Sequence, residues 1–177
     1  MKSVIAISLL AITALSGCAY KASPYGVSPA NVNAIKATGI KPVAVLPFTA
    51  TKPGAASITC RAAGPVRVVP SFERYIEGAL IDELKLASAY DPASDIKISG
   101  KLEQIDFSSG MSDGAWMFVL TISNAKNASF TVNSKWPFSG SFVADKACQE
   151  VAQAFGPSVQ NLIKEVIQDP RFKQLAQ

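Results

Sequence analysis

IKISGKL, the stretch Ile96–Leu102, decides the fold class, because its side chains alternate between apolar and polar. Alternation with a period of two predicts a β-strand that buries one face and exposes the other. The apolar phase then slips to Ile105 and Phe107, which predicts a β-bulge near Glu103 and Gln104. A sheet with one buried and one solvent-exposed face is typical of antiparallel strands.

Two further strands follow this segment. Trp116–Ile122 is a nearly continuous apolar run, and Phe130–Phe142 contains the third strand. The segment between them, Asn124–Asn127, has the composition of a hairpin turn. Pro137 cannot donate to a ladder of hydrogen bonds, so it indicates an edge strand or a bulge.

Two helices are predicted from apolar residues that repeat every three to four positions. Ser71–Ala89 begins with a serine suited to the N-cap. Glu83 falls near the centre of its apolar stripe, and we expect this carboxylate to reach past the edge of the core. The second helix, Lys146–Gln168 with Asp145 as N-cap, keeps one apolar face through Pro157, which predicts one kinked helix.

The apolar run Pro42–Phe48 predicts a buried strand before the first helix. The order of elements is then strand, helix, three strands and helix. This order predicts an α+β fold, with a four-stranded, largely antiparallel sheet and two helices packed on one face.

The amino-terminal residues resemble a bacterial lipoprotein signal. Leu15–Cys18, LSGC, matches a lipobox, and the apolar run Val4–Leu15 before it is too short to span a bilayer. The resemblance implies removal of residues 1–17, a diacylglycerol thioether on Cys18 and an acyl chain such as palmitate on its new amine. The alternative is a secreted protein with a chance cysteine at this position.

The rest of the chain divides into two expected parts. Residues 18–41 contain the lipidated cysteine and a flexible tether punctuated by Pro, Gly, Ser and Asn, with a short helix possible near 30–37. Residues 42–177 form a single α+β domain, which we expect to lie in the periplasm.

Composition restricts the function. The chain has 49% hydrophobic and 17% charged residues, and its net charge is +4. Loss of Lys2 with the leader lowers that charge to +3, which suits an anionic lipid or glycan surface but predicts no nucleic-acid partner. The sequence has no histidine, which excludes catalytic triads and most zinc sites. We therefore expect no catalytic residues, no metal and no cofactor beyond the lipid on Cys18.

Cys60 and Cys148 remain once Cys18 is assigned to the lipid. The compartment beyond the inner membrane is oxidising, so we expect a disulfide between them. Two buried free thiols are the alternative.

The open face of the sheet is expected to be mostly polar, with Met117 and Val119 as apolar exceptions near its centre. Either these are scattered surface residues or a partner covers them. Lys101 lies on the same predicted face. Ile81 lies on the polar side of the first helix, where it is either an ordinary exposed apolar residue or a contact with a partner. These four residues are the predicted partner-binding residues.

Three phrases carry a further resemblance: KPVAVLPF at 41–48, IEGALIDELKLASAYD at 76–91 and IKISGKLEQIDF at 96–107. They resemble the amino-terminal domain of the translocation protein TolB, the curli secretion lipoprotein CsgG and the small lipoproteins of lipopolysaccharide assembly. The resemblance implies a periplasmic interaction domain. Ala19 and Tyr20 after the lipidated cysteine, in place of aspartate, imply an outer-membrane anchor facing the periplasm.

These observations favour a non-enzymatic, outer-membrane-anchored lipoprotein that serves as an interaction or assembly subunit of an envelope complex. The alternative is a periplasmic carrier or chaperone for lipid or lipopolysaccharide. It would use basic residues, namely Lys52, Arg61, Arg67 and Lys101, to hold anionic head groups.

Overall fold

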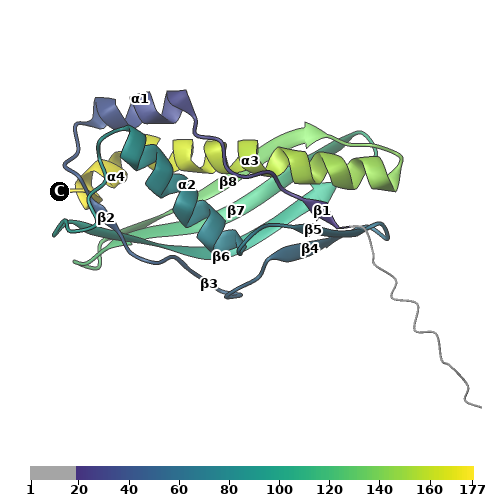
Figure 1. The fold of residues 1–177 in the computed structure, drawn as a ribbon, viewed down its shortest axis with the longest axis horizontal. Helices are drawn as coiled ribbons and strands as arrows, with labels where there is room; N and C mark the ends of the chain where they lie inside the picture. Colours follow the sequence, from purple (N-terminus) through teal and green to yellow (C-terminus); the bar gives the residue numbers. More distant parts are fainter. Residues whose placement is uncertain (1–18) are drawn as a thin grey trace, which may run out of the picture.

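The computed structural model describes residues 19–177, which form a mixed α+β fold (Figure 1). Cys18 and the leader lie outside the described residues. Within residues 19–177 the elements follow one another as β1 (Tyr20–Lys21), α1 (Pro29–Thr38), β2 (Ala44–Val45), β3 (Thr49–Ala50), β4 (Ser57–Cys60), β5 (Gly64–Arg67), α2 (Phe72–Leu86), β6 (Lys97–Ser109), β7 (Asp113–Asn124), β8 (Ser129–Ser139), α3 (Ala144–Gln168) and α4 (Pro170–Leu175).

The larger sheet has the order β2-β6-β7-β8, and β3 also pairs with β6. β6, β7 and β8 are antiparallel, as predicted. The predicted bulge is confirmed, because the β6–β7 register shifts between Leu102 and Gln104. Pro137 lies in β8, whose only partner among the described strands is β7, so its assignment to an edge strand is also confirmed.

The predicted four-stranded sheet is wrong in two respects. The segment Pro42–Phe48 contributes only the short strand β2, which runs parallel to β6, and β3 continues the same edge beyond it. Between these two strands, the buried ring of Phe48 packs against Gly100 of β6. The described residues also form a second sheet, of order β1-β5-β4, that the sequence analysis did not predict.

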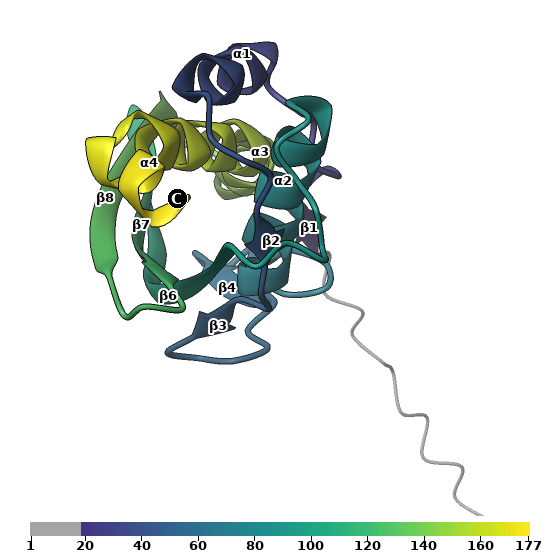
Figure 2. The same cartoon turned by 90° about the vertical axis from the view of Figure 1, so that its left-hand side faces the viewer.

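Two helices cover one face of the larger sheet, and α1 lies over both of them as a third layer (Figure 2). α2 begins at the predicted cap, since Ser71 accepts a hydrogen bond from the Arg74 amide. α3 continues through Pro157, which is exposed, so the prediction of one helix is confirmed. Its N-cap is Val143 and not Asp145, which lies in the first turn.

Aromatic rings fill the space between the helices and the sheet. Trp116 has no exposed surface, and its ring centroid lies 4.9 Å from those of Phe107 and Phe155. Its indole nitrogen donates a hydrogen bond of 2.9 Å to the Val151 carbonyl, so the one polar atom of the ring is satisfied inside the core.

The prediction of a flexible tether over residues 18–41 is wrong for the part that the structure describes. β1 pairs in parallel with β5, and α1 packs against α2 and α3. The apolar face of α1 is the physical reason, because Val32 and Ile35 are only 8% and 1% exposed. The short helix suggested near 30–37 is confirmed as α1, and the folded domain starts near residue 20 instead of 42.

Candidate functional site

One end of the molecule gathers segments from four distant parts of the sequence (Figure 1). We call it the disulfide end and define it by residues 60–63, 109–112 and 140–143, the first turn of α3, and Tyr20. Its geometry is built by a disulfide, one arginine and two close backbone approaches.

The predicted disulfide between Cys60 and Cys148 is confirmed. It joins the end of β4 to the fifth residue of α3 across 88 residues of sequence, with the two Cα atoms 5.8 Å apart. Both cysteines are completely buried. The bond therefore fastens the smaller sheet to the helix that covers the larger one.

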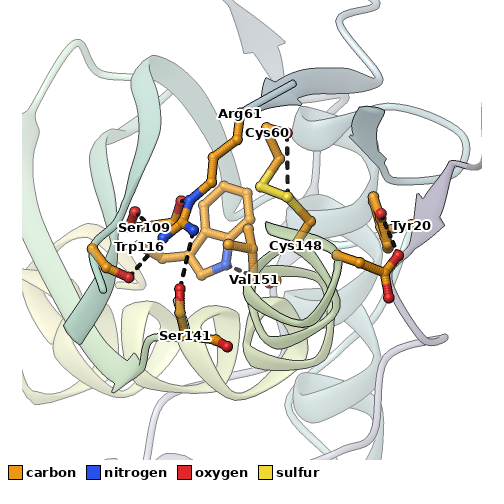
Figure 3. Close-up of a disulfide and its surroundings, with 10 residues drawn as sticks. Tyr20, Cys60, Arg61, Ser109, Trp116, Ser141, Cys148 and Val151 are labelled. Atoms are coloured by element: carbon orange, nitrogen blue, oxygen red, sulfur yellow. Dashed lines mark hydrogen bonds between the residues drawn. A yellow bond between two sulfur atoms is a disulfide. The ribbon is translucent and has the colours of Figure 1, made fainter. Parts of the chain in front are cut away.

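Arg61 binds the two loops beside the disulfide (Figure 3). Its guanidinium donates hydrogen bonds of 2.8 Å to the carbonyls of Ser109 and Gly110 and one of 3.0 Å to the Ser141 carbonyl. A planar guanidinium offers five donors in a fixed geometry, which suits several carbonyls from different segments. Arg61 is thus a structural residue, contrary to the head-group role considered for it in the carrier alternative.

The same two loops also contact each other directly. The Gly140 amide donates a hydrogen bond of 2.8 Å to the Ser112 carbonyl. A Cβ atom at Gly140 would lie 2.4 Å from the Gly110 carbonyl oxygen, so only glycine permits this approach. Residues 109–112 and 140–143 therefore form one continuous rim.

The described chain starts at this rim. The Tyr20 hydroxyl donates a hydrogen bond of 2.6 Å to a carboxylate oxygen of Asp145 in the first turn of α3, as Figure 3 shows. β1 then runs beside β5 in the register Tyr20–Val66 and Lys21–Arg67. The residue predicted to carry lipid, Cys18, precedes this fixed point by two positions.

The structure brings together three of the four predicted partner-binding residues. Lys101 lies opposite Thr121 on the sheet, and Met117 and Val119 lie on the same open face further along β7. Lys101 is exposed, and its ammonium lies 2.8 Å from the Glu103 carboxylate. Met117 and Val119 are half-buried. Ile81 is half-buried on α2, on the other side of the sheet, and does not join them.

A cavity of about 280 Å³ lies between the smaller sheet, α2 and β6. Apolar side chains provide much of its lining, including Ile58, Phe72 and Leu102. Lys52 lies at this cavity, and so does Glu73. Its Oε1 accepts the Gly54 amide at 2.8 Å, while Oε2 has no hydrogen-bond partner among residues 19–177. Pockets for drug-sized ligands measure about 300–1,000 Å³, so this one is small.

Three glutamates of α2 accept backbone amides from three different connections. Glu73 accepts from Gly54, Glu77 from Phe48 at 2.6 Å, and Glu83 from Ser28 at 3.3 Å. Glu83 is 0% exposed, so the expectation that it reaches past the core edge is wrong. Its place at the centre of an apolar stripe was the signal of a buried role.

Within the described residues no cluster of His, Cys, Asp and Glu side chains could hold a metal ion. In the same part of the chain no helix has both the length and the apolar character required to cross a bilayer.

No family model and no curated protein matches this chain. A solved structure does share its fold: the crystal structure of protein XCC0632 from Xanthomonas campestris, assigned to the family model DUF330. The similarity covers 85% of this chain and 95% of that chain, with a TM-score of 0.55 and 14% sequence identity. At this identity the likeness concerns the fold, and the resemblances to TolB, CsgG and the lipopolysaccharide-assembly lipoproteins stay predictions.

Proposed function

We propose that this protein is a lipoprotein anchored in the outer membrane, facing the periplasm, and that it acts without catalysis as an interaction or assembly subunit of an envelope complex. One observation carries the proposal: a lipobox-like LSGC sequence ends two residues before the first strand of the folded domain. A lipid on Cys18 would hold the domain directly at the membrane surface, without the long tether expected from composition.

The disulfide supports the same compartment. Disulfides persist in secreted and periplasmic proteins, whereas thiols in the cytosol are kept reduced. Cys60 and Cys148 are paired and fully buried, which fits a domain that folds beyond the inner membrane.

The open sheet face is the proposed contact with an envelope protein. Its polar rows surround Met117 and Val119, which retain partial exposure at the centre of the sheet. Protein–protein interfaces commonly place an apolar centre inside a polar rim. The ion pair of Lys101 with Glu103 lies among the polar residues that border Met117 and Val119 on this face.

The test is capture of the partner from the native cells after mild crosslinking in the cell, with mass spectrometry of the proteins and lipids that are eluted. We expect one stoichiometric envelope protein with the wild type, and at least a tenfold loss with Met117→Asp combined with Val119→Asp. Asn33→Asp combined with Gln153→Asp is the matched control, because it adds the same charge at exposed positions on α1 and α3. Unaltered capture by the first variant, with its fold intact, would contradict the proposed surface.

The carrier alternative has weaker support. The cavity of about 280 Å³ is small for a lipid, and two of the basic residues suggested for head groups already bind protein groups, Arg61 to the loops and Lys101 to Glu103. A stoichiometric phospholipid or glycolipid in the eluate, without a protein partner, would favour the carrier.

A further inference from the structure

Three large apolar side chains are exposed together at the disulfide end. Met111 is 62% exposed, Phe142 79% and Val143 63%. Exposed apolar residues that occur singly need no explanation, but these three occupy two loops joined by the bond from the Gly140 amide to the Ser112 carbonyl. They therefore form one apolar patch, which we call the apolar rim.

The apolar rim lies beside the point where the described chain begins. Val143 is the N-cap of α3, and Asp145 in the first turn of that helix accepts the Tyr20 hydroxyl at 2.6 Å. Two residues of extended chain span at most about 7 Å, so a lipid attached two positions before Tyr20 would be tethered closely to this end. A lipid on Cys18 would thus enter the bilayer next to the apolar rim.

Basic side chains border the same end. Lys21 and Arg67 are exposed register partners on β1 and β5, and Lys146 is exposed in the first turn of α3. Two nearby carboxylates already have partners: Asp145 accepts from Tyr20 and Gln149, and Asp113 accepts from Ser112. Lysine and arginine near a membrane surface are attracted to anionic lipid head groups.

Arg61 makes the apolar rim rigid. Its hydrogen bonds hold the carbonyls of Gly110 and Ser141, the neighbours of Met111 and Phe142 in sequence. The disulfide fixes the adjacent residue, Cys60, to α3. These bonds and the direct bond between the loops hold the two loop tips in one arrangement, which suits insertion of both at once.

We propose that Met111, Phe142 and Val143 insert into the boundary between head groups and acyl chains of the leaflet that holds the lipid of Cys18. The inference rests on the proposed function, because it needs the lipid to bring this end to the bilayer. The protein then stands on the membrane by its disulfide end, and its long axis carries α1, α4 and the β7–β8 turn away from the surface (Figure 1). The open sheet face stays accessible from the side.

The test uses the full, lipidated protein in vesicles of phosphatidylethanolamine and phosphatidylglycerol. With Cys18 lipidated and Cys60 bonded to Cys148, Phe142→Cys introduces the only free thiol, which takes an environment-sensitive nitrobenzoxadiazole label. Leu86→Cys is the matched control, since Leu86 is 59% exposed at the C-terminal end of α2, far from the disulfide end (Figure 1).

We expect the label at position 142 to emit at shorter wavelength on vesicles and to be quenched several-fold by lipids with a spin label in the acyl chain. The label at position 86 should keep its emission in water. Met111→Cys, on the neighbouring loop, repeats the measurement in case the first variant misfolds. If protein whose mass includes the lipid shows emission typical of water at both 111 and 142, the proposed insertion is wrong. The proposed function is then unaffected. A mass without lipid on Cys18 would overturn the insertion and the proposed function together.

Discussion

The hydroxyl of Tyr25 donates a hydrogen bond to the carboxylate of Glu83, a side chain with 0% of its surface exposed. The two residues are 58 positions apart, and their contact fastens the segment before α1 onto α2. The Asn31 side-chain amide donates to the same oxygen at 3.1 Å. The buried carboxylate therefore serves as the common acceptor that docks the amino-terminal segment on the domain.

Tyr25→Phe should lower the free energy of unfolding by about 1–2 kcal/mol, because it removes one donor from a buried carboxylate. Urea denaturation measures the change. Tyr90→Phe is the control: that ring lies 5.5 Å from the Lys85 ammonium and not beside a buried carboxylate. We expect its cost to stay within about 0.5 kcal/mol. Equal costs for both variants would refute the role of the Tyr25–Glu83 contact.

Glu83 should make stability depend on pH. Burial raises the pKa of the Glu83 carboxyl above its ordinary value, which is about 4.3 in an unfolded chain. The folded state then binds the proton more tightly than the unfolded state, and this difference adds to the free energy of unfolding. The added stability is complete below the ordinary pKa and is lost as the pH rises through the raised pKa of the folded state.

Glu83→Gln removes that titration while keeping the size of the side chain. The stability of the variant relative to the wild type should therefore rise as the pH increases above the ordinary pKa of a glutamate. Urea midpoints across this pH range provide the measurement, and parallel curves for wild type and Glu83→Gln would contradict the account.

Loss of the disulfide should destabilise the domain strongly. Cys60→Ala combined with Cys148→Ala opens a loop of 88 residues, and the chain-entropy relation assigns about 4–5 kcal/mol to its closure. Denaturation with and without reductant tests this value. Reductant should weaken the wild type to the level of the variant and leave the variant unchanged. If reductant, added to the unfolded wild type, leaves its free energy of unfolding unchanged, the two cysteines are not bonded.

Two glycine substitutions should act in opposite directions. A Cβ at Gly100 would lie 2.4 Å from the ring of Phe48, so Gly100→Ala should cost about 1–3 kcal/mol through overpacking. A Cβ at Gly78, inside α2, meets nothing within 4 Å, so Gly78→Ala should add about 0.5–1 kcal/mol. Thermal or urea unfolding of the two variants measures both signs. A neutral Gly100→Ala would contradict the packing of Phe48 on β6.

Sequence patterns predicted the elements whose conformation is determined by residues that are neighbours in the sequence. The alternation in β6, the bulge after Leu102 and the turn after Asn124 each follow from neighbouring residues. α3 could be predicted as one helix because its apolar face keeps phase on both sides of Pro157. The disulfide followed from counting cysteines in an oxidising compartment.

Sequence analysis missed β1 and the docking of α1 on the domain, and both depend on contacts between distant segments. β1 has two residues, too few for any period, and exists because β5 lies beside it. α1 is only weakly amphipathic. Besides burying Val32 and Ile35, it is docked by the hydrogen bond from Asn31 to Glu83, which is 52 residues away. The apolar rim could not be predicted because Met111 and Phe142 are 31 positions apart in the sequence. Arg61 and the close approach of Gly140 to Gly110 bring their loops together.

In the proposed function, a lipid on Cys18 anchors this domain in the outer membrane. The most direct test is the intact mass of the protein extracted with detergent from the outer-membrane fraction of its own cells. The account predicts a chain that begins at Cys18 and carries a diacylglyceryl group and an amide-linked acyl chain, with Cys18→Ser absent from that fraction. An unmodified mass, or wild-type protein that fractionates as Cys18→Ser does, would contradict it.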